Sequence, residues 1–337
     1  MSAINPAAAA TGHAADRADA LRHIDPAVFS RFARPDARGW LLGVCTEWAI
    51  IAAMMAACVA YPSVLLWAVA VFVIGTRQHA LGIMAHEGVH SLVSTTRAVN
   101  DGLANWLSAY PLMYSVQGYR TYHLQHHRWL ETEKDPEQTA LRLYPREWTF
   151  PMPRRRFFYL LCRDMLGGSV KPAGDLVQYI WQVPGGKRPQ VARVVVFHVS
   201  AAALAIALGH AMVYFILWVV PLFTVALMCF RVRTVAEHSG ISEPDMRYRQ
   251  PSVDTLATTR TTIYNAVMKF LFGPHNMAYH IEHHLFPDVP VFRLRRLHDE
   301  LMKSPDYARR AKVSRGHAAL LDALTYRNAP SAGAARS

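Results

Sequence analysis

Three short histidine clusters carry the chemistry that this sequence can perform. Residues 86–90 read HEGVH, residues 123–127 read HLQHH and residues 280–284 read HIEHH. Histidine is rarely a core residue, and neutral imidazole is the commonest metal ligand in proteins. On a helix, residues i, i+3 and i+4 share one face, so we expect each cluster to direct its rings toward a single point. Eight imidazoles exceed what one four-coordinate ion can use, and the pattern therefore predicts two metal ions.

A ninth histidine and several carboxylates are expected to complete this metal site. His238 follows the last apolar segment of the chain, where it would lie level with the clusters. Glu87, Glu237 and Glu282 each stand next to a predicted ligand, and such carboxylates orient ligand imidazoles and raise their basicity. No catalytic side chain is predicted apart from the metal ligands. These ligands are His86, His90, His123, His126, His127, His238, His280, His283 and His284.

Four apolar segments must position these residues. Hydrophobic residues make up 52% of the chain and are concentrated in residues 40–61, 63–84, 191–208 and 211–230. A membrane-spanning helix needs about 20 apolar residues. Arg77 interrupts the second segment, so we expect this segment to leave the hydrocarbon there and continue as a helix that carries the first cluster. Glu47 lies inside the first segment and is expected either to pair with Arg77 or to reach the interface.

The distribution of basic residues predicts the orientation of these segments. The expected turns, residues 61–63 and 209–211, contain no Lys or Arg, and cytoplasmic loops of membrane proteins carry an excess of both. The sequence therefore predicts an all-α integral membrane protein with four transmembrane helices in two hairpins and a cytoplasmic helical cap that carries the metal site. We expect it in a bacterial inner membrane, with both termini and the active site cytoplasmic. The predicted division is a tail over 1–37, a membrane domain over 38–305 and a tail over 306–337.

The net charge of the chain is +12. We interpret this excess as basic residues that contact the anionic lipid headgroups of the bilayer. It is also compatible with docking of an acidic redox partner. Nucleic acid binding is not predicted, because the basic residues flank membrane spans and form no recognition module. The four cysteines form no CxxC motif, which predicts neither disulfides nor a zinc ribbon.

The three clusters resemble the histidine boxes of the membrane fatty acid desaturase family. The resemblance covers about residues 38–300, and residues 276–287 are similar to the third box of bacterial members. It implies a non-haem di-iron centre that activates O2 and either removes two hydrogens or inserts oxygen at an unactivated C–H bond. His238 matches the additional ligand of the family. One branch of the family has Asn four residues before that ligand, where this chain has Thr234. Asn276 is the residue that would take the place of this Asn, acting through a water.

The physical chemistry of the metals agrees with this resemblance. Imidazole suits iron as well as zinc, and O2 activation needs a redox metal, which zinc is not. Each turnover would consume two external electrons. The nearest match to a cytochrome b5 haem motif, residues 183–186, reads VPGG and lacks the histidine, and no ferredoxin-type cysteine cluster occurs. A separate ferredoxin, rubredoxin or cytochrome with its reductase is therefore expected.

Several alternatives stay open at the level of sequence. Residues 86–90 also fit the HExxH motif of an intramembrane zinc protease, although that reading leaves the other boxes unused. A non-enzymatic metal or haem carrier is a third class. Within the resemblance, a hydroxylase would use the same ligands. A fatty acyl chain is the preferred substrate, and the alternative is a small amino-acid-derived metabolite. A polar substrate would need charged residues near the metals, for which the candidates are Arg231, Arg233, Arg260 and Asp135.

Overall fold

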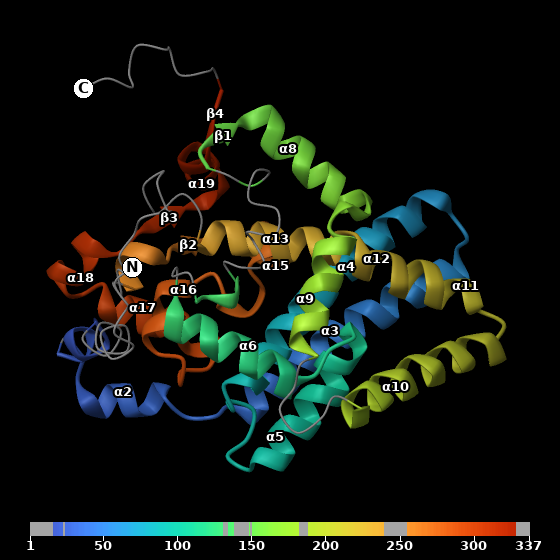
Figure 1. The fold of residues 1–337 in the computed structure, drawn as a ribbon, viewed down its shortest axis with the longest axis horizontal. Helices are drawn as coiled ribbons and strands as arrows, with labels where there is room; N and C mark the ends of the chain where they lie inside the picture. The colour runs from blue at the N-terminus through green and yellow to red at the C-terminus, as the bar shows by residue number, and fades with distance from the viewer. Residues whose placement is uncertain are drawn as a thin grey trace.

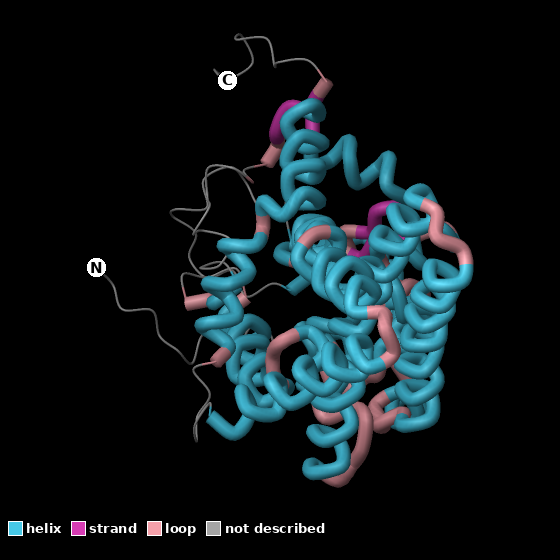
Figure 2. Tube along the Cα trace, turned by 90° about the vertical axis from the view of Figure 1, so that its right-hand side faces the viewer, coloured by secondary structure: helices cyan, strands magenta, loops and turns pink. Residues whose placement is uncertain are grey.

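The computed structural model describes residues 16–22, 24–130, 134–137, 148, 150–181, 188–238 and 255–327. Most of this described chain is helical, and its strands form short pairs (Figures 1 and 2). Strand β1 (Met152–Pro153) pairs in parallel with β4 (Thr325–Tyr326), and β2 (Thr261–Ile263) pairs in parallel with β3 (Val313–Arg315). The predicted all-helical architecture is therefore correct apart from these small ladders.

Within the described residues, four stretches are long and apolar enough to cross a membrane, as the sequence predicted. The first contains α2 (Pro26–Phe32) and α3 (Ala37–Ala60), and the second is α4 (Val64–Val89). The third is α10 (Arg188–Ala207). The fourth runs from Ala211 to His238 through α11 (Ala211–Tyr214), η4 (Phe215–Val219), α12 (Val220–Phe223) and α13 (Val225–His238). Helix α4 continues past Arg77 into the first histidine box, which confirms that one continuous helix carries this box.

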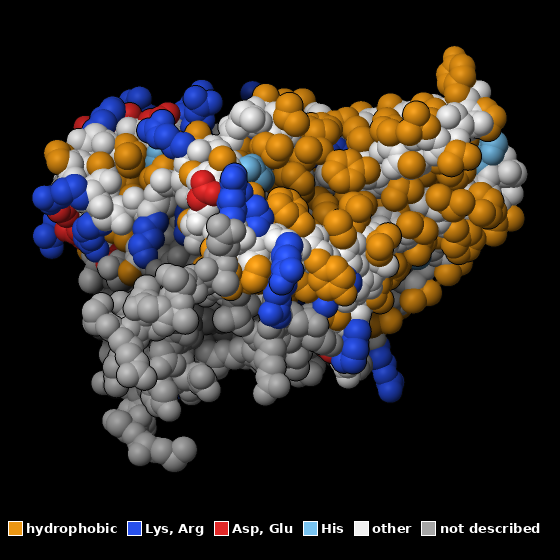
Figure 3. Space-filling view, turned by 90° about the horizontal axis from the view of Figure 1, so that it is seen from above, with side chains coloured by type: hydrophobic (Ala, Val, Ile, Leu, Met, Phe, Trp, Pro, Cys, Tyr) orange, Lys and Arg blue, Asp and Glu red, His pale blue; other side chains and the backbone are white. Residues whose placement is uncertain are grey.

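The outer surface of these stretches is apolar. Large exposed side chains on α10 and the following turn include Val195, Val199, Leu204 and Leu208. Figure 3 shows hydrophobic side chains covering the end of the molecule formed by these helices, whereas Lys and Arg gather toward the opposite end. This separation matches a body embedded in lipid at one end and in water at the other.

The remaining helices, together with the ends of α4 and α13, form the part of the molecule that carries the site. Between α4 and α10 lie α5 (Arg97–Ala104), η1 (Asn105–Ala109), η2 (Tyr110–Leu112), α6 (Val116–Trp129), α8 (Arg154–Arg163), η3 (Asp164–Gly168) and α9 (Val170–Ile180). After α13 come α14 (Thr255–Thr258), α15 (Ala266–Phe272), η6 (Pro274–Asn276), α16 (His280–Leu285), α17 (Val291–Leu301), α18 (Pro305–Arg310) and α19 (Gly316–Leu324).

Helix α4 is the centre of the core, and its glycines allow close packing. A Cβ on Gly75 would lie 2.5 Å from Cβ of Val225 on α13, and one on Gly88 would lie 2.3 Å from Cβ of Ala104 on α5. Interiors are packed closely enough that such overlaps cannot be absorbed. The second half of α4, from Ile74 onward, is accordingly buried.

A buried ion pair connects the first two spans. Arg77 Nη1 lies 3.1 Å from Glu47 Oε2, and the two side chains are 2% and 3% exposed. Glu47 Oε1 also lies 2.8 Å from His275 Nε2, and Arg77 donates to the carbonyl of Phe270. Glu47 therefore pairs with Arg77, which is one of the two arrangements expected from the sequence; the other was that it reaches the interface.

Candidate metal centre

Three helices bring the histidine boxes together. Helix α4 ends at the first box, with His86 in its last turn and His90 as its C-cap. Helix α6 begins at Ser115, whose side chain accepts from the Gly118 N–H, and carries the second box. The third box forms α16. The helical periodicity predicted for the second and third boxes is therefore confirmed.

Five of the nine predicted ligands form one cluster, in which every residue is buried except the half-buried His90. Each offers a ring nitrogen within 4.8 Å of all the others. The Nε2 atom of His123 lies 2.8 Å from that of His86 and 2.9 Å from that of His127. His127 Nε2 is in turn 3.0 Å from His283 Nε2. The five-histidine cluster comprises His86, His90, His123, His127 and His283.

The other four histidines form a second cluster directly beside the first. The Nε2 atom of His280 lies 2.8 Å from that of His238 and 3.0 Å from that of His284. The rings of His284 and His127, one from each cluster, stack with centroids 4.2 Å apart. The four-histidine cluster comprises His126, His238, His280 and His284.

The boxes do not each converge on one point, which corrects the expectation from sequence. In the second and third boxes the i and i+4 rings turn to one side and the i+3 ring to the other, so that His126 and His283 each join the opposite cluster from their neighbours. At about 100° per residue, position i+4 lies roughly 40° to one side of position i and i+3 roughly 60° to the other. The HxxHH spacing therefore serves two centres from one helix.

The geometry of both clusters suits metal ions. Imidazole nitrogens held about 2.1 Å from a common ion at right angles would lie about 3.0 Å apart. The nearest nitrogen pairs are 2.8–3.0 Å apart. The Nε2 atom of His90 is buried and has no hydrogen-bond partner in the described structure. A buried polar atom without a partner is costly, and coordination of a cation would satisfy it.

Burial also keeps these rings in the form that binds metal. Desolvation lowers the pKa of His90 to about 3, with the charge of Arg120 adding to the effect. Desolvation likewise lowers the pKa of His123, His280 and His284 well below the ordinary value, and neighbouring imidazoles contribute further. A metal ligand must be the neutral imidazole, and these rings are neutral at pH 7.

Two acidic residues that were not predicted as part of the metal site lie against His126. Both carboxylate oxygens of Asp135 are 3.0 Å from His126 Nδ1, and Asp135 is fully buried. Glu137 Oε2 lies 3.3 Å from His126 Nε2, on the side of the four-histidine cluster. Asp135 had been considered only as a contact for a polar substrate. No periodicity connects residues 135 and 137 to the boxes, although a short Asp-Pro-Glu sequence follows the second box.

The three glutamates predicted beside the ligands, and Asn276, contact different partners. Glu237 Oε1 lies 3.5 Å from His280 Nδ1 and pairs with Arg233. Glu87 accepts from the Val291 N–H, and its other oxygen lies 4.0 Å from His86 Nδ1. The contacts of Glu282 and Asn276 are with the scaffold: Glu282 binds Thr261, His298 and Tyr307, while Asn276 binds Lys269 and the carbonyl of Val291.

Comparison with known proteins agrees with this geometry. A family model described as fatty acid desaturase matches residues 62–315. The chain belongs to the fatty acid desaturase family. This desaturase-family protein is also 26% identical over 293 residues to the dihydrorhizobitoxine desaturase of Bradyrhizobium elkanii, an alignment that covers 82% of this chain and 79% of that enzyme. The HExxH protease reading is not retained, because both histidines of the motif lie in a cluster shared with the other boxes.

Proposed function

We propose that this protein is an O2-dependent desaturase whose two clusters each bind one iron. The observation that carries the proposal is the pair of adjoining buried clusters of five and four histidines. Membership of the desaturase family and similarity to a desaturase support the reaction class. In the overall reaction, a CH2–CH2 unit loses two hydrogens, two external electrons and two protons are consumed, and O2 is reduced to two waters.

The protein contributes ligand positions, orientation and exclusion of water. Bound iron would supply the redox chemistry that protein side chains lack. Asp135 accepts from His126 Nδ1 and so directs Nε2 of that ring into the four-histidine cluster. Glu282 connects α16 to β2, α17 and α18 through Thr261, His298 and Tyr307, which fixes the third box. Such supporting contacts commonly change metal affinity by about 10–100-fold when removed.

A fatty acyl chain remains our first substrate candidate. The exposed apolar side chains of the spanning stretches support delivery of a hydrocarbon chain from the bilayer. The second candidate is a small amino-acid-derived metabolite, which is favoured by the name of the bacterial relative. A hydroxylase with the same ligands would insert oxygen into the substrate instead of removing hydrogens.

The electrons would come from a separate ferredoxin, rubredoxin or cytochrome with its reductase. Arg155 and Arg156 on α8 are exposed and basic, as a surface for an acidic carrier requires. We place this surface, the active site and both termini in the cytoplasm of a bacterium, with the spanning stretches in the inner membrane.

Product analysis tests this function. The purified iron-loaded protein would be supplied with O2, a reduced ferredoxin and either acyl substrates or amino-acid-like carboxylates, and the products analysed by mass spectrometry. A desaturase yields a product lighter by two hydrogens. A product heavier by one oxygen would support the hydroxylase instead. Turnover by the isolated chain with NADH and O2 alone would contradict the requirement for a separate carrier.

A further inference from the structure

A cavity of about 130 Å³ opens beside the third histidine box. We call it the vestibule. Two of its walls carry cationic side chains, Lys269 from α15 and Arg295 from α17. None of the described residues that line it is acidic. The other lining residues are Thr262, Ile263, Tyr264, Gly273, Asn276, Ala278 and Tyr279.

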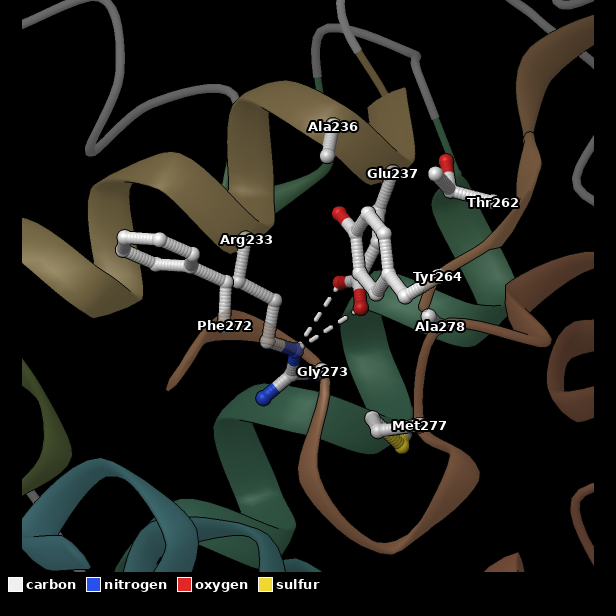
Figure 4. Close-up of a pocket in the computed structure, with 9 residues that line it drawn as sticks. All are labelled: Arg233, Ala236, Glu237, Thr262, Tyr264, Phe272, Gly273, Met277 and Ala278. Carbon is white, nitrogen blue, oxygen red and sulfur yellow. Dashed lines mark hydrogen bonds and ion pairs between the residues drawn. The ribbon is translucent and has the colours of Figure 1, made fainter. Parts of the chain in front are cut away.

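The vestibule adjoins a smaller inner cavity of about 10 Å³, which is close to what one water molecule requires. The two cavities share four lining residues, namely Thr262, Tyr264, Gly273 and Ala278. Figure 4 shows the inner cavity, with Arg233 and Glu237 extending from α13 and joined by their ion pair. Because Glu237 Oε1 lies 3.5 Å from His280 Nδ1, the inner cavity ends at the outer edge of the four-histidine cluster.

The local structure builds the vestibule and keeps it open. Asn276 adopts a φ of +66°, and its side chain accepts from Lys269 Nζ at 2.6 Å, which holds the ammonium group at the cavity wall. Gly273 leaves room for the Tyr264 ring, because a Cβ there would lie 2.4 Å from Tyr264 Cδ2. A larger residue at 273 would push this ring away from its position between the two cavities.

The described residues that line the vestibule carry positive charge only, and the nearby acidic Asp299 lies outside the lining, one turn after Arg295 on α17. Burial lowers the pKa of Lys269, and the positive charge of Arg295 lowers it further, so the two cations repel each other across the cavity. Behind Tyr264, Arg260 is 5% exposed, and its Nη1 has no hydrogen-bond partner in the described structure. Converging cations without a carboxylate attract an anion, and Lys and Arg form strong charge-assisted hydrogen bonds with anionic oxygens.

We propose that the vestibule binds the carboxylate of a small substrate through Lys269 and Arg295. The volume lies below the roughly 300 Å³ lower limit of pockets for drug-sized ligands, which favours a short carboxylic acid. Anchored at the vestibule, the rest of such a molecule would lie along Tyr264 and Gly273. Because the inner cavity holds only about one water, the Tyr264 ring would have to move for the molecule to reach the four-histidine cluster. The inference rests on the proposed function and selects the second of its two substrate candidates, the small metabolite, because it assigns this anion to the substrate of the desaturase.

Binding of n-butyrate to the full-length protein tests this proposal without turnover. The protein is placed in nanodiscs of zwitterionic phosphatidylcholine, and its affinity for butyrate and for uncharged butyramide is measured by saturation-transfer NMR. We expect butyrate alone to bind, and both Lys269→Met and Arg295→Gln to weaken its binding about tenfold or more. Arg296→Gln is the matched control, because Arg296 is an exposed arginine on the same helix that does not line the cavity. Metal content and thermal unfolding of each variant show that it is folded.

Three outcomes would overturn the proposal. Equal binding of butyramide would show that the anionic group is not recognised. An equal loss in Arg296→Gln would indicate general attraction by the surface charge. Displacement of butyrate by inorganic phosphate, or by phosphatidylglycerol added to the nanodiscs, would assign the site to a free phosphate or a lipid headgroup. None of these outcomes affects the proposed iron chemistry, whose own test is product formation.

Discussion

Arg120 Nη2 donates to the carbonyl of Gly88 at 2.7 Å, and this contact joins the helix of the second histidine box to the end of the first. Arg120 Nε also donates to the carbonyl of Val89 at 2.8 Å. The last carbonyls of a helix lack partners within that helix, so the guanidinium caps α4 at the turn from which His86 and His90 project. Asp101 also accepts from Arg120 Nη2, at 2.6 Å, and so holds the guanidinium in place.

Arg120→Lys should loosen the five-histidine cluster. Lysine cannot reproduce the planar set of donors that Arg120 directs at Gly88, Val89 and Asp101. Losing hydrogen bonds to a charged group predicts a decrease of about 2 kcal/mol in the free energy of unfolding, together with a lower iron content. Arg97→Lys is the control, because Arg97 binds the same Asp101 but is 62% exposed. Equal effects of the two substitutions would contradict a positioning role for Arg120.

Asp135→Asn should weaken metal binding at the four-histidine cluster. The carboxylate orients His126 through Nδ1, and an amide could present its NH2 group there instead. We expect a loss of about 10–100-fold in metal affinity, measured by competition with a chelator. Glu137→Gln tests the second carboxylate at the other nitrogen of the same ring. Asp175→Asn, at a half-buried carboxylate that binds Lys171 on α9, should leave affinity unchanged. Unchanged affinity in Asp135→Asn would show that His126 needs no such orientation.

Glu47→Gln should destabilise the membrane-embedded part of the protein. The substitution leaves Arg77 buried without its charge partner, which typically costs about 3 kcal/mol or more. Unfolding in mixed micelles with increasing SDS measures the effect. Thr46→Ala, at an exposed position on the same helix, is the control. The double variant Glu47→Gln, Arg77→Met should recover part of the loss, and no recovery would mean that the pair is not the source of the stability.

The metal-free protein should lose stability in acid. The pKa of His90 is about 3 in the folded protein, against 6.5 for an ordinary histidine, so between these values the unfolded chain binds more protons than the folded one. Stability must therefore fall as the pH decreases from about 6.5 toward 3, by up to about 1.4 kcal/mol per pH unit for each such histidine. Thermal unfolding of the chelator-treated protein between pH 8 and pH 5 measures this. A melting temperature that rises on acidification would contradict the assignment of neutral buried rings.

Cysteine labelling tests the predicted orientation. Single cysteines are introduced into a variant whose native cysteines are replaced. Ser63→Cys places one in the turn between α3 and α4, and Arg309→Cys places one on α18. An impermeant thiol reagent applied to the outside of intact cells should label the first and not the second. Labelling of Arg309→Cys from outside would refute the proposed topology.

The sequence predicted the elements of this fold well where one local signal was strong. Apolar runs of about 20 residues identified the four spanning stretches, and the repeated HxxHH spacing identified two helices that present metal ligands. His238, which has no box of its own, was found from its position just beyond an apolar segment, and it lies in the four-histidine cluster.

The division of the ligands between two centres could not be predicted, because it depends on how three helices are rotated relative to one another. His283 belongs with His86 rather than with its neighbour His284 only through tertiary packing. The same holds for Asp135, whose contact with His126 follows from the path of the chain after α6. Glu282 stands beside a ligand in sequence, but its partners Thr261, His298 and Tyr307 could not be predicted from that adjacency, because they come from separate elements of the fold.

Iron stoichiometry tests the central claim most directly. We predict two irons per chain in the purified active protein, measured by elemental analysis and Mössbauer spectroscopy. His280→Ala should preferentially deplete iron from the four-histidine cluster, and His90→Ala should preferentially deplete it from the five-histidine cluster. Each variant would then retain about one iron, with a different spectrum. An active protein that contains one zinc and no iron would contradict the account.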